Sequence, residues 1–128
     1  MKSLIHYTQD RQTAVFNEAG AFFAFTRKQF DQAKMEGVEY CHIVSGLICP
    51  VQNAKKLINQ LAIIQQEGIV QDIQENGKKA IIRRELFNHE CFYTNDIGDC
   101  VEELEEYGYT YDDIYEEFTR IRKAEDGY

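Results

Sequence analysis

The sequence lacks tryptophan and contains a single proline, Pro50, among its 128 residues. It has no apolar run near the ~18 to 20 residues that a membrane-spanning helix needs, and its first residues lack the apolar core of a secretory signal. We therefore expect a cytoplasmic protein with no membrane association. The four cysteines are too few for a disulfide scaffold, and no two have the two-residue spacing of zinc or redox motifs.

Positive charge is scarce in the last third of the chain. Residues 1–84 contain eleven Lys or Arg and eight Asp or Glu, whereas residues 85–128 contain three and fourteen. The first part therefore carries a formal charge of +3 and the second −11, which gives the net charge of −8. Such a surface repels nucleic acid and attracts basic partners, so we expect no direct binding of nucleic acid.

The length and the hydropathy pattern fit one domain over residues 1–128, with an acidic helical C-terminal third at about 85–128. We predict a helix-dominated α+β fold, with about five helices and a small two- or three-stranded sheet. Apolar residues at helical spacing predict helices at about 8–20, 27–36, 51–67, 78–92, 97–107 and 111–124.

Turn and cap signals set the expected boundaries. Residues 21–25 read as a short buried strand, which could pair with a strand or hairpin arm at 39–49. Thr26 with Gln29 and Thr110 with Asp113 have the spacing of capping boxes, and Asp96 is a further candidate cap. We expect Gly68 to interrupt the helix that follows Pro50.

The two terminal predicted helices carry carboxylates on the faces opposite their apolar stripes, where they should face solvent or a partner. Residues of a helix rise ~1.5 Å each, and duplex DNA presents one phosphate per ~1.7 Å, so a row of acids can imitate a nucleic-acid backbone. The alternative is that these acids serve solubility and complement the helix dipoles. The candidate binding residues are Glu102, Glu103, Glu105, Glu106, Asp112, Asp113, Glu116 and Glu117.

A second candidate site is a polar and aromatic segment at a predicted helix end and the turn after it. Convergent polar groups among aromatic rings are what a small-molecule pocket requires, and Glu85 lies four residues before His89 as an orienting group. The alternative is a structural histidine at the helix end, with Phe92 and Tyr93 in the core. The candidate pocket residues are Asn88, His89, Glu90, Tyr93, Thr94, Asn95 and Asp96.

Metal and cofactor signals are weak. A zinc site could in principle use Cys41, His42, Cys49, Cys91 and Cys100, but no close-spaced pair forms half of one, so we expect inert reduced thiols and no metal. The sequence has no glycine-rich phosphate loop and no nucleophile elbow, and we expect no cofactor. The basic doublets at 55–56, 78–79 and 83–84 are expected to solvate helix faces, with phosphate contact as the alternative.

Several ordered segments resemble the landmarks of an uncharacterised family of small proteins from phages, conjugative elements and plasmids of gut and related bacteria. These segments begin at Phe22 (FFAFTxxQF), Ile43 (IVS), Arg84 (RELFNHE, followed by YTND) and Gly108 (GYTYDDI), and the resemblance covers about residues 15–115. It implies a mobile-element context, in which small acidic proteins often counter host defence.

Three functions fit these sequence features. The leading hypothesis is a non-enzymatic inhibitor whose acidic surface mimics nucleic acid and occupies a basic groove of a host defence enzyme. The runner-up is a homodimeric protein that sequesters a nucleotide signal in a pocket around His89, Tyr93 and Asn95. The third is an enzyme that uses His89 and Glu90 as acid and base, which is disfavoured because no nucleophile or metal set accompanies them.

Overall fold

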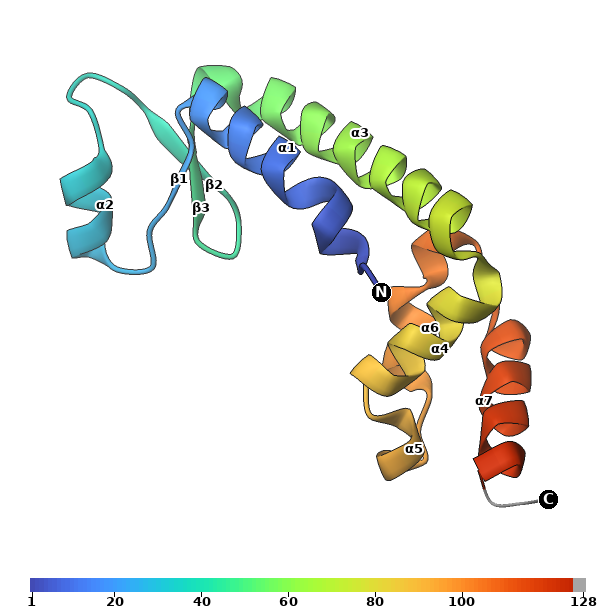
Figure 1. Ribbon diagram of the computed structural model, residues 1–128. Helices are drawn as coiled ribbons and strands as arrows, with labels where there is room; N and C mark the ends of the chain where they lie inside the picture. Colours follow the sequence, from blue (N-terminus) through green and yellow to red (C-terminus); the bar gives the residue numbers. More distant parts are fainter. Residues whose placement is uncertain (126–128) are drawn as a thin grey trace. The chain divides into compact units, whose positions relative to one another are not determined.

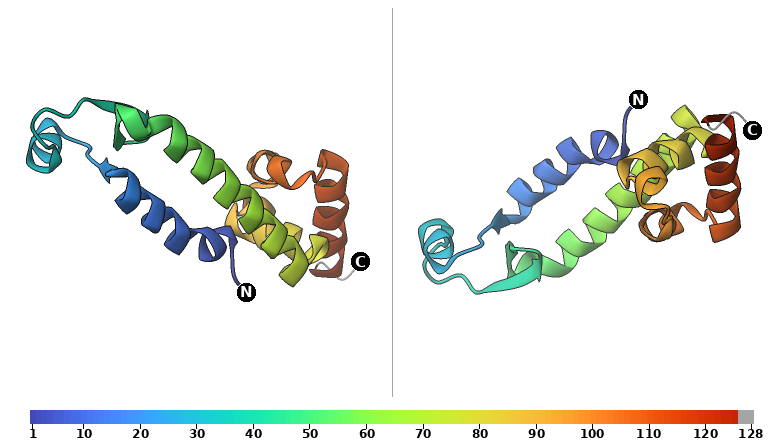
Figure 2. Two further views of the ribbon diagram at one scale, coloured as in Figure 1. Left: turned by 90° about the horizontal axis from the view of Figure 1, so that it is seen from above. Right: turned by 90° about the horizontal axis from the view of Figure 1, so that it is seen from below.

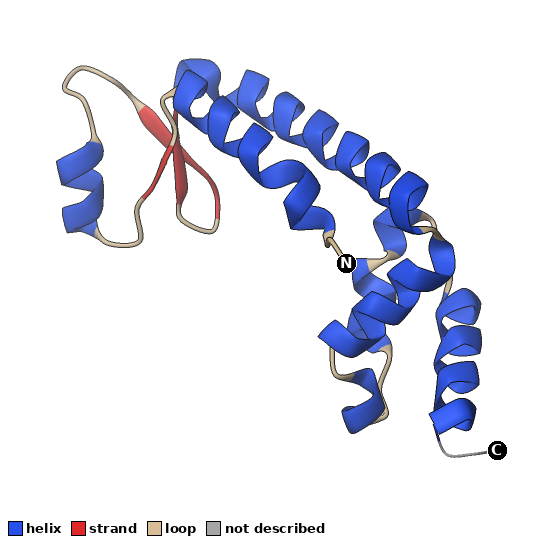
Figure 3. Cartoon of the chain, viewed as in Figure 1, coloured by secondary structure: helices blue, strands red, loops and turns tan. Residues whose placement is uncertain are grey.

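The computed structural model describes residues 1–125, and in this part of the chain seven α-helices accompany a three-stranded sheet (Figures 1 and 3). The fold is therefore helix-dominated α+β, as the sequence predicts. Contacts divide the chain into two compact units. We name them the sheet unit, Leu4–Gly68, and the helical unit, which consists of Met1–Ser3 and the residues from Ile69 onward.

The sheet unit combines two helices and the start of a third with a small antiparallel sheet. Its strands lie in the order β1-β3-β2, so the predicted pairing of residues 21–25 with the hairpin is confirmed, with β3 as the partner. Phe22 pairs with Ile48, and the β2–β3 ladder has an irregularity between His42 and Val44. The elements are α1 (Leu4–Ala19), β1 (Phe22–Phe23), α2 (Arg27–Ala33), β2 (Tyr40–Val44), β3 (Leu47–Pro50) and the first part of α3 (Val51–Asn76).

Helices α1 and α3 lie side by side in the sheet unit (Figure 2). Ala19 at the end of α1 packs with Leu57 near the start of α3, whereas Thr8 lies near Gly68, so the two helices are antiparallel. The expected interruption at Gly68 is wrong, because α3 continues through it to Asn76. A Cβ atom on Gly68 would lie 2.5 Å from Thr8 Cγ2, so glycine permits the close helix approach there.

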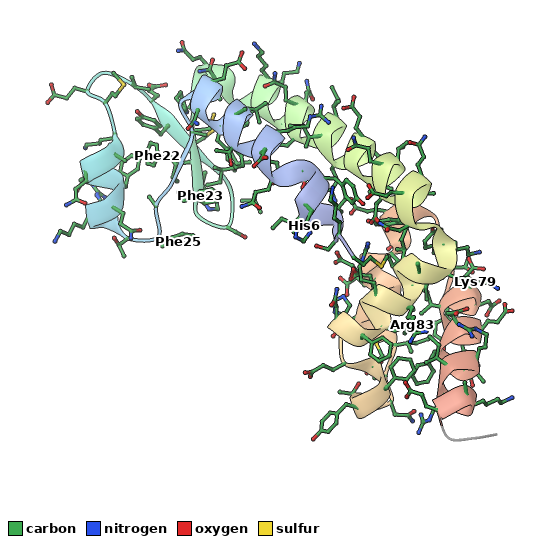
Figure 4. The ribbon with its side chains drawn as sticks, in the orientation of Figure 1. His6, Phe22, Phe23, Phe25, Lys79 and Arg83 are labelled. Carbon is green, nitrogen blue, oxygen red and sulfur yellow. The ribbon has the colours of Figure 1, made fainter. Side chains whose placement is uncertain are left out.

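The predicted burial of residues 21–25 is only partly correct. Phe22 is half-buried and its ring meets Tyr40, but Phe23 is exposed and Phe25 is 71% exposed. The Phe23 and Phe25 rings stack with centroids 6.3 Å apart (Figure 4). Strand β1 is therefore an edge strand whose aromatic residues lie on two different sides of the sheet.

The helical unit is built around α4 (Lys78–Asn88), which contacts α5 (Cys91–Thr94), α6 (Gly98–Glu103) and α7 (Tyr111–Glu125). Its buried core is largely aliphatic and includes Ile81, Ile82, Leu86, Leu104 and Ile114. The predicted helix at 78–92 ends at Asn88, and the one at 97–107 is divided into α6 and a 3-10 turn, η1 (Glu105–Tyr107). No helix among the described residues is long and apolar enough to cross a membrane.

The predicted capping box at Thr110 is complete, whereas the one at Thr26 forms only one of its two hydrogen bonds, because Gln29 Oε1 accepts from the Phe25 amide and not from the Thr26 amide. The Gln29 amide donates to Thr26 Oγ1 at 3.1 Å, and the Asp113 amide donates to Thr110 Oγ1 at 3.2 Å. Asp113 Oδ2 also accepts a hydrogen bond from the Thr110 amide at 2.9 Å. Asp96 is not the cap of α6, because Ile97 occupies that position, but its Oδ1 accepts from the Gly98 amide at 2.8 Å. Local sequence therefore fixes where α2 and α7 begin.

The cap of α7 makes a testable contribution to acid stability. Lys78 Nζ lies 2.9 Å from Asp113 Oδ1, and this contact, with the Thr110 hydrogen bonds, lowers the pKa of Asp113 from 3.8 to about 2. A lowered pKa stabilises the fold above the unfolded-state value, and the stabilisation is lost as the pH falls through the folded-state value. We expect Asp113→Asn to lower the melting temperature at pH 6 but hardly at pH 2.

The exposed neighbour Asp112 provides the control for this measurement, because Asp112→Asn removes a charge without removing the cap. Its change in melting temperature should be smaller than that of Asp113→Asn at pH 6. An equal effect of Asp113→Asn at both pH values would contradict the assignment of the low pKa to this carboxylate.

Candidate functional site

Most of the predicted acidic face is exposed, and it lies on three successive elements of the helical unit. The four glutamates at 102, 103, 105 and 106 lie on α6 and η1, and the remaining two exposed acids lie on the first half of α7. We name this set the acidic surface. It consists of Glu102, Glu103, Glu105, Glu106, Asp112 and Glu116.

Two of the eight predicted binding carboxylates do not belong to the acidic surface. Glu117 is 5% exposed and pairs with the Arg120 guanidinium, so the prediction that it faces solvent is wrong. The pairing one turn along the helix compensates the charge where α7 packs into the unit. Asp113 is half-buried and engaged by Lys78 and by the Thr110 amide. Both residues therefore have structural roles.

The predicted pocket segment does not converge on one site. His89 is the C-cap of α4, and its Nε2 lies 3.8 Å from Glu85 Oε2, which confirms that Glu85 is next to it. Asn88 donates to Glu85 Oε1 at 3.4 Å. Glu90 and Asn95 both have left-handed backbone conformations, with φ of 56° and 60°. These two left-handed residues turn the backbone, so the side chains of the segment point to different parts of the surface.

Two hollows share the residues of this segment. Glu90 and Tyr93 line a hollow of about 340 Å³ together with Phe87 and Phe92. Tyr93 is 90% exposed, so its side chain is neither part of the core nor packed into the wall of a pocket. Asn95 and Asp96 line a second, larger hollow instead. His89, Tyr93 and Asn95, the centre of the pocket hypothesis, therefore do not line either of these hollows together.

The larger hollow, which we name the tyrosine hollow, has a volume of about 480 Å³ and lies in the helical unit. Tyr111 and Tyr115 lie on α7, and both are more than half exposed. Their rings stack with centroids 6.0 Å apart, since they lie one turn apart on the helix. The hollow is lined by residues 95–98 and by Tyr111, Tyr115, Phe118, Thr119, Arg122 and Lys123.

The expectation that Arg84 solvates a helix face is wrong, because its side chain takes part in a buried ion pair of the helical unit. Asp72, which is 0% exposed, receives two 2.9 Å hydrogen bonds from the Arg84 guanidinium, one on each carboxylate oxygen. Tyr107 Oη donates to Asp72 Oδ2 at 2.5 Å, and Asn76 donates to Oδ1 at 2.8 Å. Arg84 also donates to Glu85 at 2.9 Å. The charged groups of this network are therefore all paired.

The pKa shifts of this network follow from its contacts. Burial raises the pKa of Asp72, but the hydrogen bonds from Arg84, Tyr107 and Asn76 outweigh it, so that pKa lies below its usual range. Burial and the hydrogen bond to Asp72 raise the pKa of Tyr107. The Asp72 carboxylate and the Tyr107 hydroxyl therefore keep their charged and neutral forms at neutral pH, which is the behaviour of a structural network and not of a proton shuttle.

The sequence does contain signals for the buried ion pair and for the tyrosine hollow. Asp72 occupies an apolar-stripe position of α3, four residues after Gly68, where a charge requires a buried partner. The tyrosine hollow follows the spacing of Tyr111, Tyr115, Phe118 and Arg122, which places aromatic and basic side chains on one side of α7.

The cysteines are free thiols, as predicted. Cys49, Cys91 and Cys100 are buried, whereas Cys41 is half-buried. Burial, together with the nearby Cys91, raises the pKa of Cys100 to about 12, which keeps this thiol protonated. Among the described residues, no group of three or more His, Cys, Asp or Glu side chains could hold a metal ion.

These observations define a small helix-dominated α+β protein with an acidic helical unit. The model of the family of unknown function DUF7659 matches residues 4–126, so the chain belongs to this family. This agrees with the expectation that the chain belongs to an uncharacterised family. No curated protein and no solved structure has a significant match to the chain.

Proposed function

We propose that this protein is a non-enzymatic binding protein whose acidic surface occupies a basic groove of a host protein, one that otherwise holds nucleic acid. The distribution of charge is the observation that carries this proposal. Residues 85–119 contain no lysine or arginine, and the whole acidic surface lies within this stretch. Cys100, Tyr107 and Ile114 of the same elements are buried, so the carboxylates are left facing outward.

The spacing of the carboxylates supports mimicry of a nucleic-acid backbone. Residues rise ~1.5 Å each in α6 and ~2.0 Å each in a 3-10 turn such as η1, close to the ~1.7 Å per phosphate along duplex DNA. Exposed charges of one sign steer a complementary partner and increase its association rate. The negative potential of the acidic surface also repels phosphates, so the protein itself should not bind DNA or RNA at physiological salt.

The biological setting is the second part of the proposal. The landmark segments resemble those of proteins from phages, plasmids and conjugative elements, and small acidic proteins of such elements often counter host defence. We therefore propose that the protein acts in the bacterial cytoplasm and inhibits a nucleic-acid-acting defence enzyme. The inhibitor would block the groove by charge complementarity without chemistry of its own.

A charge-reversal experiment tests this function. The tagged full chain and the triple variant Glu102→Lys, Glu103→Lys, Glu105→Lys are used to capture proteins from a bacterial lysate, followed by mass spectrometry and nuclease assays of the captured enzymes. We expect the wild type to retain and inhibit a nucleic-acid-binding enzyme that duplex DNA displaces. The triple variant should lose at least about tenfold in affinity, mainly through slower association.

The sheet unit offers a control variant with the same change in net charge. Asp10, Glu36 and Glu39 are exposed and lie outside the acidic surface, and their reversal to lysine also changes the net charge from −8 to −2. This control variant should keep the partner. If both triple variants bind equally well, or if duplex DNA does not compete, the acidic surface is not the interface.

A further inference from the structure

The tyrosine hollow has the size and the wall of a small-molecule site. Its volume of about 480 Å³ falls within the ~300 to 1,000 Å³ of typical ligand pockets. The stacked rings of Tyr111 and Tyr115 form an aromatic wall that faces solvent and not the core. Planar ligands stack on such rings, and a nucleic-acid base gains ~1 to 3 kcal/mol per aromatic contact in known sites.

A guanidinium is held in place at the same hollow. Arg122 donates to Asn95 Oδ1, and its Cζ atom lies 5.8 Å from the centroid of the Phe118 ring. These contacts come from two elements and fix the orientation of the side chain. Since a guanidinium has five N–H donors, the bond to Asn95 leaves others for an anion. Arginine binds phosphate with charge-assisted hydrogen bonds in planar geometry.

The remaining charges of the lining favour a single anionic group. Lys123 adds a second cation beside Arg122. Asp96 is the acid of the lining, but its Oδ1 already accepts the hydrogen bond of the Gly98 amide. Thr119 supplies a hydroxyl within the same lining. The hollow therefore combines an aromatic wall with two cations, although most of the helical unit is acidic.

We infer that the tyrosine hollow binds a free mononucleotide, with the base against Tyr111 and Tyr115 and the phosphate at Arg122 and Lys123. A free mononucleotide fits better than a nucleic-acid strand, because the acidic surface would repel every phosphate beyond the first. This site is built from residues outside the acidic surface. The inference therefore goes beyond the proposed function, and either can fail without the other.

Titration of the isotopically labelled full chain with AMP, adenosine, inorganic phosphate and a short oligoadenylate, followed by NMR, tests the site. We expect AMP to shift the resonances of the Gly98 amide, the Asn95 side chain and Arg122 Nε. Adenosine should bind about tenfold more weakly than AMP, since it lacks the charge-assisted bonds to the guanidinium. Inorganic phosphate, which lacks the stacking contribution, should also bind at least about tenfold more weakly than AMP.

Variants separate the two halves of the hollow. Arg122→Gln should reduce the affinity for AMP toward that of adenosine, and Tyr115→Leu should weaken AMP and adenosine alike. Lys123→Gln provides a second test of the anion subsite if Arg122→Gln loosens the loop at Asn95. Tyr93→Leu, at an exposed tyrosine outside this hollow, should bind AMP as the wild type does.

Three results would overturn the inference. They are the absence of shifts with AMP, equal affinities for AMP and adenosine, and tighter binding of the oligoadenylate than of AMP. The triple reversal at Glu102, Glu103 and Glu105 separates this outcome from that of the proposed function. It should retain AMP binding even if it loses the protein partner.

Discussion

Replacing Arg84 by methionine should reduce the free energy of unfolding by about 3 to 5 kcal/mol, because the substitution leaves the Asp72 carboxylate buried without its charged partner. The Asp72 side chain is 0% exposed, and Arg84 supplies two of its hydrogen bonds. A loss of this size is a large part of the ~5 to 15 kcal/mol that stabilises a typical domain. Urea denaturation followed by circular dichroism measures it.

A double substitution shows whether the charge itself causes the loss. Arg84→Met combined with Asp72→Leu removes both members of the pair, and we expect it to recover much of the stability, since buried pairs can often be replaced by apolar residues. Tyr107→Phe is a milder probe that removes one hydrogen bond to the carboxylate and should cost about 1.5 to 3 kcal/mol.

Arg83 is the matched control for Arg84. It is the preceding residue of α4 (Figure 4), is exposed, and lies with Cζ 5.6 Å from the centroid of the Phe87 ring. Arg83→Met should cost no more than about 1 kcal/mol. If Arg84→Met and Arg83→Met destabilise the protein equally, the buried ion pair does not hold the helical unit together.

Gly68→Ala should destabilise the sheet unit by about 1 to 3 kcal/mol, because the added methyl group would overlap Thr8 where α1 approaches α3. The Cβ atom would lie 2.5 Å from Thr8 Cγ2 and 3.3 Å from Leu4 Cδ1. Helix propensity alone predicts the opposite sign, a gain of about 1 kcal/mol for alanine over glycine inside a helix. The sign of the change in unfolding free energy therefore decides between close packing and propensity.

Two further variants isolate the clash at Gly68. Thr8→Ser removes the Cγ2 methyl and keeps the hydroxyl, which donates to the Leu4 carbonyl, so it should restore part of the stability of Gly68→Ala. Ala62→Gly, at an exposed position of the same helix, measures the propensity contribution without a packing change. A stabilising Gly68→Ala, or no rescue by Thr8→Ser, would contradict the close approach at this point.

Sequence predicts those parts of the fold that depend on near neighbours along the chain. The cap hydrogen bonds at Thr26 and Thr110 join residues three positions apart, and both are present. Gly20 and Gly108 follow the ends of α1 and the η1 turn with positive φ angles, a conformation that glycine adopts at low cost. Apolar spacing also places Ile114 and Phe118 in the core.

Contacts between distant residues decide the rest, and sequence does not reveal them. Gly68 lies inside α3, and the close contact with Thr8 that needs a glycine there involves a residue 60 positions away in α1. The partners of Asp72 lie 12 and 35 positions away, at Arg84 and Tyr107. Periodicity also treats every position of a stripe alike, so it does not distinguish the buried Ile114 from the exposed Tyr111 at the edge of the same stripe.

The candidate site shows the same division. Sequence predicts correctly that the carboxylates of the acidic surface are exposed, because their exposure follows from the positions of the apolar residues beside them. It did not predict that Glu117 pairs with Arg120 in a buried position. It grouped Tyr93 with Asn95 by proximity in the chain, whereas the left-handed residues Glu90 and Asn95 turn the backbone and separate their surroundings.

The small sheet has consequences for self-association. Exposed strand edges readily recruit strands from other molecules, which leads to aggregation. Here one edge is β1, which has two residues, and the other is β2, whose ladder is irregular between His42 and Val44. A short edge and a distorted edge offer few regularly spaced backbone groups to a further strand. The protein should therefore stay dispersed at high concentration although Phe23 and Phe25 are exposed beside the sheet.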